Sequence, residues 1–343
     1  MPHYRLAFLG FGNVGRALAR LLTQKQSELL TRYNITFSVT GISTGKHGSA
    51  IDPDGMDLES ALRLVESGGN LEQLNVGPRP VDNFDLIRRC QADVLFENTP
   101  VEHGSGQPAI EHIRLALETG MHVATANKGP IVHAYKELTD LAYAHKRAFL
   151  FESTVMDGAP IFSLFRAALP GAQLNALRGV LNSTTNLILT RMENGESFED
   201  AVKYAQSIGI AETDPSGDVD GWDAAIKVAA LVTVLMGIPL KPQQVDRQGI
   251  RDLTPAQIMA AKAEGKRWKL VCSARREGDG VQARVAPEIV SASSSLYNIE
   301  GTSSIVEFET DVLGLLSLHE SDPGPETTAY GLMADFINAV NQN

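Results

Sequence analysis

The sequence predicts two domains: an α/β domain built on a parallel sheet, followed by a second, α+β domain. Short apolar runs alternate with amphipathic stretches over the first 150 residues, which is the pattern of consecutive strand–helix units. Beyond residue 150, longer helical stretches are followed by strand-like segments. At 343 residues, the chain also exceeds what one hydrophobic core usually holds. We therefore expect the first domain to cover residues 1–150 with a final helix at about 325–343, and the second to cover 151–324.

The first domain is expected to open with a strand, a turn and a helix. Residues 6–9 form an apolar run that ends at Gly10. The apolar residues that follow recur at helical spacing on one face: Val14, Ala17, Leu18, Leu21 and Leu22. Further strands are expected at 35–42, 94–96, 122–125 and 149–151, and further helices near 58–65, 109–119 and 135–145. Strands that alternate with helices imply parallel pairing through right-handed crossovers.

The second domain is expected to contain helices between residues 159 and 236 and strands between residues 268 and 318. Asp220 is predicted to cap the last of these helices, which is buried and ends at Gly237. The final segment, residues 327–340, is amphipathic, and we expect it to pack against the first domain.

Composition and charge exclude several classes of protein. The chain carries 41 acidic against 30 basic side chains, a formal net charge of −11, which repels nucleic acids and anionic membrane surfaces. No apolar run reaches the roughly 18 residues that a membrane-spanning helix needs. The two cysteines, Cys90 and Cys272, are too few for a disulfide framework or for a metal site of their own. Because the start of the chain leads directly into a strand, we expect no signal peptide and a cytoplasmic location.

A glycine-rich turn lies between the first strand and the first helix. It consists of Gly10, Phe11, Gly12, Asn13, Val14 and Gly15. In the spacing G-x-G-x-x-G, the first glycine permits a tight turn, the second lets backbone N–H groups approach a pyrophosphate, and the third allows close packing of helix and strand. The helix N-terminus adds partial positive charge. The turn therefore predicts a Rossmann-type dinucleotide-binding domain, against the alternative of a purely structural glycine turn.

The end of the second predicted strand bears on the choice of cofactor. Sites specific for NAD usually place an Asp or Glu there to bind the ribose hydroxyls. Residues 41–46 contain no acidic side chain and offer Ser43, Thr44 and Lys46 instead. Hydroxyls and one cation suit the 2′-phosphate of NADP, so we expect NADP, with NAD also possible. The alternative is that Lys46 is a solvated loop lysine.

Four charged residues gather in the second domain. Asp223 and Lys227 are four residues apart on a predicted helix and share a face. Glu212 and Asp218 lie in the preceding loop. Acids clustered with one lysine can hold a substrate ammonium group while the cation addresses a polar oxygen. Spacing alone does not distinguish this arrangement from a solvated pair at the start of a surface helix.

With these features on one chain, the sequence resembles the homoserine dehydrogenases over nearly its whole length. Six segments carry the resemblance in order, at residues 10–15, 125–128, 152–160, 181–186, 209–227 and 324–329. The resemblance implies an enzyme of threonine and methionine biosynthesis that interconverts L-aspartate 4-semialdehyde and L-homoserine with NAD(P)(H). The block from Ala211 to Lys227 is the most specific of the six.

The resemblance also implies roles for single residues. Glu212 and Asp223 would bind the amino acid substrate, together with Asp218. Lys227 would donate a proton to the aldehyde oxygen as hydride arrives, and Lys128 would lie beside the nicotinamide. The sequence does not settle which lysine transfers the proton; we predict Lys227, held by Asp223, with Lys128 as an electrostatic and positioning partner.

Cofactor, cation and subunit contacts are implied in the same way. The resemblance implies that Phe11, Asn13, Val14, Thr99, Lys128, Gly209 and Gly324 line the cofactor site; the glycine turn and the end of the second strand add Gly10, Gly12, Gly15, Ser43 and Lys46. A monovalent cation, Na⁺ or K⁺, is expected on the backbone carbonyl oxygens of Glu152, Val155, Asp157 and Ala159. The family habit is a homodimer formed through the sheet of the second domain.

Three departures from the family pattern bear on the substrate. Met156 and Asp157 replace glycines near the expected nicotinamide end, Ser183 replaces a glycine, and serine replaces an asparagine within residues 302–304.

Because the sequence ends soon after residues 324–329, we also expect no C-terminal regulatory domain and no feedback inhibition by threonine through such a domain. The alternatives are a related dehydrogenase of another small amino or hydroxy acid, or a dinucleotide-binding regulator without turnover. Retention of Lys128, Lys227 and the acids speaks against the regulator.

Overall fold

The computed structural model describes residues 2–341 and divides into two compact units. Unit 1 comprises Met1–Pro160 with Gly324–Asn343, and unit 2 comprises Ile161–Pro323. Residues 342–343 of the predicted final helix lie outside the described residues. None of the helices within residues 2–341 combines the length and the apolar character needed to cross a membrane.

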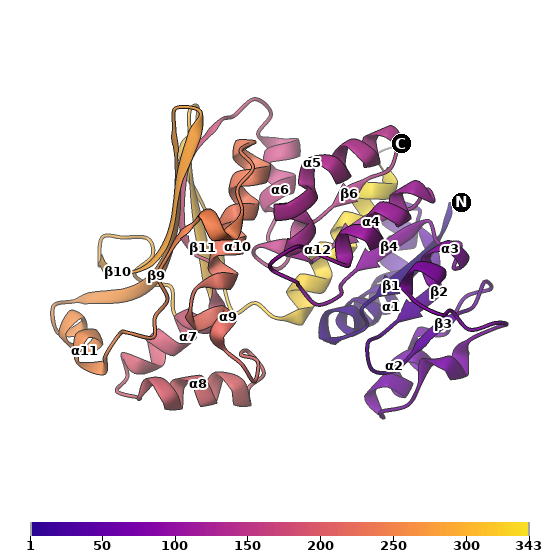
Figure 1. The fold of residues 1–343 in the computed structure, drawn as a ribbon, viewed down its shortest axis with the longest axis horizontal. Coiled ribbons are helices and arrows are strands. Elements are labelled where there is room, and N and C mark those ends of the chain that lie inside the picture. Colours follow the sequence, from indigo (N-terminus) through magenta and orange to yellow (C-terminus); the bar gives the residue numbers. More distant parts are fainter. Residues whose placement is uncertain (1, 342–343) are drawn as a thin grey trace. The chain divides into compact units, whose positions relative to one another are not determined.

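Unit 1 is built on a six-stranded sheet whose central strands are parallel (Figure 1). The strand order is β3-β2-β1-β4-β5-β6, and only the edge strand β3 runs antiparallel to its neighbour. The strands are β1 His3–Leu9, β2 Thr36–Ser43, β3 Ser49–Ile51, β4 Val94–Glu97, β5 His122–Thr125 and β6 Phe149–Leu150. The predicted parallel sheet is confirmed, because buried strands alternate with helices along this part of the chain.

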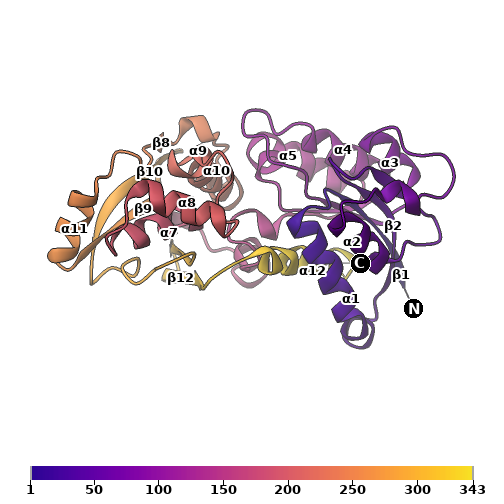
Figure 2. The ribbon, with the colours of Figure 1, turned by 90° about the horizontal axis from the view of Figure 1, so that it is seen from below.

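The helices of unit 1 include the C-terminal one. They are α1 Asn13–Tyr33, α2 Leu58–Glu66, α3 Asn83–Arg89, α4 Ala109–Glu118, α5 Lys128–Ala144 and α12 Pro325–Asn341, with short 3₁₀ turns η1 Leu71–Leu74 and η2 Glu152–Thr154. Figure 2 shows α12 lying along α1. Phe336 of α12 packs edge-on against Tyr4 and Phe96, with ring centroids 6.0 and 6.2 Å away. The end of the chain therefore completes the hydrophobic core of unit 1.

A helical segment that the sequence does not predict precedes one predicted helix of unit 1, and it changes the position of a candidate residue. Helix α5 spans Lys128–Ala144 with a break at Ala134, where φ is −142°; the part after the break agrees with the helix expected at 135–145, and the part that begins at Lys128 is additional. Asn127 caps it, since its side-chain oxygen accepts a hydrogen bond from the N–H of Gly129 at 3.0 Å, and Pro130 occupies its first turn. Lys128 is therefore the first residue of a helix directly after β5.

Unit 2 is built on a second six-stranded sheet, of order β12-β11-β7-β9-β10-β8. Its strands are β7 Leu174–Val180, β8 Asp246–Arg247, β9 Lys266–Glu277, β10 Gly280–Ser291, β11 Ser304–Thr310 and β12 Gly314–Glu320. Strand β7 lies within a region predicted to be helical, and that prediction is wrong. Gly179 explains its central position, because a Cβ atom there would lie 2.3 Å from the carbonyl oxygen of Ile305 on β11.

The helices of unit 2 include those that carry the acid and lysine cluster. They are α6 Ile161–Ser163, α7 Ser183–Met192, α8 Phe198–Ser207, α9 Ser216–Val219, α10 Trp222–Leu231 and α11 Pro255–Ala263, with short turns η3 Leu164–Ala168, η4 Val232–Met236 and η5 Pro242–Gln244. Asp220 does not cap α10 as predicted. Gly221, in the left-handed region at φ 81°, precedes the helix, and the Asp220 carboxylate pairs with Arg251. The predicted end at Gly237 is confirmed.

A buried lysine of unit 2 forms hydrogen bonds with α7 and with the Ile299 carbonyl. Lys269 on β9 is fully buried, and its ammonium group donates a hydrogen bond to Asn186 of α7 at 3.0 Å and another to the Ile299 carbonyl. Burial lowers the pKa of Lys269 to about 8.

Burial raises the pKa of the Cys90 thiol to about 11 and that of the Cys272 thiol to about 12, so both thiols are protonated and unreactive at neutral pH.

Candidate functional site

The three glycines of the turn before α1 differ in what surrounds them. A Cβ atom at Gly10, whose φ is 87°, would lie 2.2 Å from the carbonyl oxygen of Asn98, and one at Gly15 would lie 2.5 Å from the carbonyl oxygen of Gly10. At Gly12 a Cβ atom would meet no atom within 4 Å. Gly10 and Gly15 are therefore required by packing, whereas Gly12 leaves the space beside the start of α1 free for a ligand.

Two observations at this turn fit an anionic, hydrogen-bonding ligand. Helix α1 is 21 residues long, begins without a side-chain cap at Gly12 and has no acidic residue in its first turn, so its N-terminus can receive a phosphate. Within residues 2–341, the buried side-chain amide atoms of Asn98 have no hydrogen-bond partner. The N–H of Asn98 donates to Leu9 O at 2.7 Å, which holds this residue beside Gly10. Sequence analysis missed Asn98, although its place just after a predicted strand was a signal.

Other predicted cofactor residues of the turn are engaged with the protein. The side chain of Phe11 is 1% exposed and packs edge-on against Phe8 at 5.6 Å, so only its backbone can reach a cofactor. The side-chain oxygen of Asn13 accepts a hydrogen bond from Arg16 at 2.9 Å. Val14 packs partly buried against the core.

At the end of β2, the two residues expected to contact the 2′-phosphate, Ser43 and Lys46, have different surroundings. Ser43 is buried, and its hydroxyl donates to Asn83 at 2.6 Å and accepts from Ser49 at 3.0 Å. Because both hydrogen bonds are made within the protein, the Ser43 side chain holds the loop and does not face a ligand. Lys46 is exposed in the turn between β2 and β3.

The ends of β4 and β5 lie side by side, and a buried network joins them. Glu97 is fully buried, and its carboxylate accepts hydrogen bonds from the N–H of Thr99 at 3.2 Å, from the Thr99 hydroxyl, and from the Thr125 hydroxyl at 3.2 Å. The Asn127 amide donates to the Thr99 carbonyl at 3.2 Å. Thr99 and Lys128 are therefore held at the carboxyl edge of the sheet, where parallel sheets bind their ligands.

The segment predicted to hold a cation, residues 152–159, is fastened to α12. The N–H of Glu152 donates to Asp335 at 2.8 Å, and the Ser153 hydroxyl donates to the Thr328 carbonyl at 2.7 Å. The Thr328 hydroxyl donates to Asp157 at 2.6 Å. These contacts place Glu152 beside Asp335 in the second half of α12 and Asp157 beside Thr328 near its start, and Gly324 directly precedes this helix. Val155 and Ala159 lie in the same segment. No group of three or more His, Cys, Asp and Glu side chains suited to a metal occurs in the described part of the chain.

The departures at Met156 and Asp157 are accommodated within unit 1. Met156 is 1% exposed. Asp157 adopts a left-handed backbone conformation, with φ of 46°, and its carboxylate is turned toward Thr328 of α12. A glycine would take this conformation without strain, and the hydrogen bond to Thr328 offsets part of the cost for aspartate.

In unit 2, Asp223 and Lys227 form an ion pair that is largely shielded from water. The Lys227 ammonium lies 3.0 Å from the Asp223 carboxylate and donates to the carbonyl of Leu181 at 2.7 Å. The two side chains are only 20% and 14% exposed. A solvated pair on a surface helix is thereby excluded, and the arrangement fits a cation held for chemistry.

Asn182 connects the two acids of this cluster. Its side-chain N–H₂ donates to Asp218 at 2.7 Å and to Asp223 at 3.0 Å, while its oxygen accepts from the N–H of Thr185 and caps α7. Burial, and then the charge of Asp223, raise the pKa of Asp218. Sequence analysis gave Asn182 no role, although an asparagine before a predicted helix is a typical cap.

The remaining predicted residues of unit 2 lie in the loop before α9. Glu212 is exposed there, and its backbone carbonyl accepts a hydrogen bond from Gln206 at 3.0 Å. Gly209 follows α8 with φ of 75°, and a Cβ atom there would meet no atom within 4 Å. The structure thus assembles Asp218, Asp223 and Lys227, with Glu212 on the neighbouring loop.

Family comparisons cover most of the chain. Residues 10–152 match the family described as homoserine dehydrogenase, NAD binding domain, and residues 160–337 match the family described as homoserine dehydrogenase. The NAD(+)-dependent homoserine dehydrogenase of Pseudomonas canavaninivorans is 37% identical over 98% of this chain and 96% of its own length.

Solved structures agree with this relationship. A putative homoserine dehydrogenase from Archaeoglobus fulgidus superposes with a TM-score of 0.86 at 30% identity and covers 98% of both chains. A hyperthermophilic archaeal homoserine dehydrogenase in complex with NADPH superposes with a TM-score of 0.83 at 30% identity, covering 100% of this chain and 99% of the other.

Proposed function

Because the chain belongs to the homoserine dehydrogenase family, we propose that it interconverts L-aspartate 4-semialdehyde and L-homoserine with NADP(H) in preference to NAD(H). The observation that carries the proposal for unit 2 is the shielded Asp223–Lys227 pair, 3.0 Å apart, beside Asp218. The test is oxidation of L-homoserine by the purified protein with each nicotinamide cofactor.

The catalytic assignment follows from the charge that the reaction creates. Reduction of an aldehyde leaves negative charge on its oxygen, so a proton donor is needed there. We assign this role to Lys227. Asp223 favours the ammonium form of this lysine, and the hydrogen bond to the Leu181 carbonyl orients the ammonium group. Asp218, Asp223 and Glu212 supply the negative charge that attracts the substrate ammonium group.

Unit 1 supplies the residues for the cofactor, which carries the hydride. The start of α1 with Gly12 receives the pyrophosphate, and the Asn98 amide offers a donor and an acceptor beside it. Thr99 and Lys128, at the carboxyl edge of β4 and β5, serve the nicotinamide end.

The preference for NADP(H) rests on Lys46. The Pseudomonas relative is named as NAD(+)-dependent, whereas the archaeal structure contains NADPH, so the relatives do not decide the preference. In this chain, residues 41–48 carry no carboxylate, and Lys46 is exposed in the turn after β2. A partly exposed lysine contact to a phosphate contributes about 1 kcal/mol or a little more, and about 1.4 kcal/mol corresponds to a preference of about tenfold in kcat/KM.

Lys46→Ala is expected to raise the KM for NADPH until the preference for NADPH over NADH largely disappears, with NADH kinetics nearly unchanged. Steady-state kinetics with both cofactors provide the measurement, and Lys25→Ala, on the exposed face of α1, is the control. If the wild type uses NADH better, or if the substitution impairs both cofactors equally, Lys46 binds no phosphate.

We also propose a monovalent cation, Na⁺ or K⁺, on the carbonyl oxygens of residues 152–159. Carbonyl oxygens suit a hard cation, and the hydrogen bonds to Asp335 and Thr328 hold the backbone of this segment in one shape. Replacement of Na⁺ and K⁺ by tetramethylammonium should lower kcat; an unchanged kcat would count against the cation.

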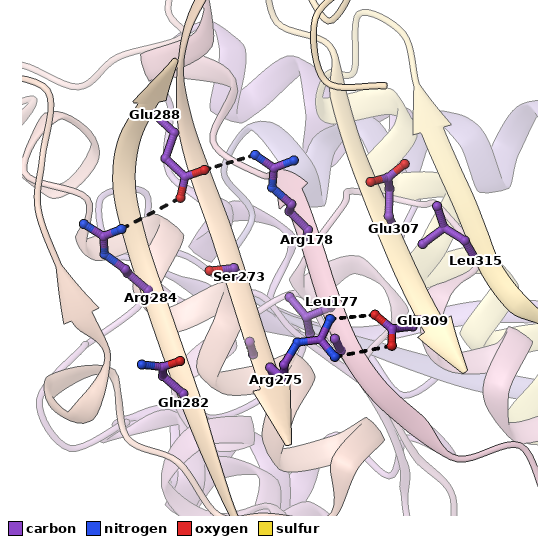
Figure 3. Close-up of a pocket in the computed structure, with 12 residues that line it drawn as sticks. Leu177, Arg178, Ser273, Arg275, Gln282, Arg284, Glu288, Glu307, Glu309 and Leu315 are labelled. Carbon is purple, nitrogen blue, oxygen red and sulfur yellow. Dashed lines mark hydrogen bonds and ion pairs between the residues drawn. The ribbon is translucent and has the colours of Figure 1, made fainter. Parts of the chain in front are cut away.

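A homodimer through the sheet of unit 2 is the third part of the proposal. Figure 3 shows one face of this sheet, on which arginines and glutamates stand opposite one another: Arg275 and Glu309 are 2.6 Å apart, and Arg178 and Glu288 are 3.0 Å apart. Leu315 is 63% exposed beside them. Because this face carries charges of both signs, a second copy of the same face can offer each charge an opposite partner.

Arg275→Glu should weaken such a dimer, because it places a carboxylate beside Glu309 and against the same row of the second copy. Sedimentation equilibrium should give the mass of two chains for the wild type and a shift toward one chain for the variant. Arg32→Glu, on α1, is the control. A wild-type mass of one chain at micromolar concentration would refute the dimer.

A further inference from the structure

We propose that Asn182 is a positioning residue for the substrate acids, separately from its role as the cap of α7. The inference rests on the proposed function, which places Asp218 and Asp223 at the substrate. In this arrangement the Asn182 amide sets the direction of both carboxylates toward the ammonium group of the amino acid.

The geometry uses every hydrogen-bonding group of the side chain. Asn182 is 3% exposed. Its two N–H bonds go to carboxylates on different helices, Asp218 on α9 at 2.7 Å and Asp223 on α10 at 3.0 Å. Its oxygen accepts from the N–H and the hydroxyl of Thr185, each at 2.8 Å. One amide therefore ties the start of α7 to the two helices that carry the acids.

A neutral double donor suits this position because the cluster already contains two acids. The groups that face Asp218 are Asp223 and Lys227 on α10, and Asn182 and Thr184 at the start of α7. Burial and the Asp223 charge raise the pKa of Asp218, whereas the hydrogen bond from Asn182 lowers it. Asn182 thus favours two ionised carboxylates close together without adding a cation that would compete with the substrate ammonium.

The adjacent residue completes the arrangement. The carbonyl of Leu181 accepts the hydrogen bond from Lys227, and the side chain of Asn182 holds the two acids. Two neighbouring residues between β7 and α7 therefore orient the site. The backbone of Leu181 orients the proposed proton donor, and the side chain of Asn182 orients the substrate acids. A residue that only capped α7 would not need the N–H₂ group.

Asn182→Asp and Asn182→Ser separate the two roles. Both replacements keep an oxygen that caps a helix well, and both lose the N–H₂ group. We expect kcat/KM for homoserine to fall about 10- to 100-fold in each, mainly through KM, because hydrogen bonds to charged groups are lost. The KM for NADP⁺ should stay within about twofold of wild type, and Thr254→Asp, at the cap of α11, should leave kinetics unchanged.

The pH dependence of kcat/KM for homoserine distinguishes a positioning residue from a helix cap, because loss of a cap alone would not shift it. Without the amide hydrogen bond, the pKa of Asp218 rises further, and in Asn182→Asp a third carboxylate raises it again. The acid limb of kcat/KM for homoserine should therefore move to higher pH in Asn182→Ser, and farther in Asn182→Asp. If Asn182→Asp does not fold, Asn182→Ser alone supplies both measurements.

Wild-type kcat/KM and an unmoved acid limb in a folded variant would overturn the inference and leave Asn182 as a cap. Equal losses for homoserine and for NADP⁺ would also overturn it, because they would indicate general damage to the fold. The proposed function fails by a different result, namely that the folded wild-type protein reduces neither NADP⁺ nor NAD⁺ in the presence of L-homoserine.

Discussion

Lys227→Ala is expected to lower kcat for homoserine oxidation by about 10²–10⁴-fold, the usual contribution of a positioned general acid or base. In the wild type, the ammonium group is directed by Asp223 at 3.0 Å and by the Leu181 carbonyl at 2.7 Å. Alanine removes the group that accepts the hydroxyl proton in oxidation and donates it in the reverse reduction, and it leaves the Asp223 carboxylate without this partner. Because Lys227 lies in unit 2, the Kd of NADP(H), whose proposed residues are mainly in unit 1, should change little.

The measurement is kcat by steady-state kinetics, with NADPH binding followed by fluorescence. Lys203→Ala is the matched control, since Lys203 is a lysine of the neighbouring helix α8 that is 74% exposed and pairs with Asp200. Near wild-type turnover in a folded Lys227→Ala protein would exclude Lys227 as the proton donor.

Lys128→Ala is expected to lower kcat by about 10²-fold or more, because a cation near developing negative charge stabilises the transition state. Lys128 is the first residue of α5, and the Asn127 cap and its hydrogen bond to Thr99 fix this helix start at the carboxyl edge of the sheet. Lys136→Ala on the same helix, where Lys136 is 85% exposed, is the control.

The pH dependence of the two variants separates the lysines. If Lys227 is the proton donor, kcat of Lys128→Ala should be lower than that of the wild type at every pH but follow a pH profile of the same shape. In Lys227→Ala, the limb of the profile that reflects titration of the donor should be lost. Loss of that limb in Lys128→Ala alone, with Lys227→Ala active, would reverse the two assignments.

Much of unit 1 could be predicted from local sequence signals. The apolar run before Gly10 and the helical spacing after it predict β1 and α1, and the structure confirms both. The parallel order of the sheet follows from the alternation of strands and helices. The start of α5 was missed, although Asn127 and Pro130 are ordinary signals of a helix N-terminus.

Elements whose position depends on distant residues could not be predicted in this way. Strand β7 lies in a region that the sequence predicts to be helical, and its place in the sheet depends on close approach of Gly179 to Ile305, which is far along the chain. Asp220 resembles a helix cap in sequence, but it pairs with Arg251, more than 30 residues away. Tertiary contacts override the local preference in both cases.

The candidate site shows the same division. The pair Asp223 and Lys227 could be found by spacing, yet only the burial of the two side chains excludes a solvated pair. Ser43 has a residue type that suits a phosphate, but its hydroxyl is engaged with Asn83 and Ser49. Asn182 was visible only as part of a motif, because the partners that suggest its role come from two other helices.

The most direct test is the oxidation of L-homoserine by the purified wild-type protein, followed by the absorbance of the reduced nicotinamide with NADP⁺ and, separately, with NAD⁺. The proposed function predicts turnover with both cofactors, with kcat/KM about tenfold higher for NADP⁺, and almost no turnover by the Lys227→Ala protein under the same conditions. Failure of the folded wild-type protein to reduce either cofactor in the presence of L-homoserine would contradict it.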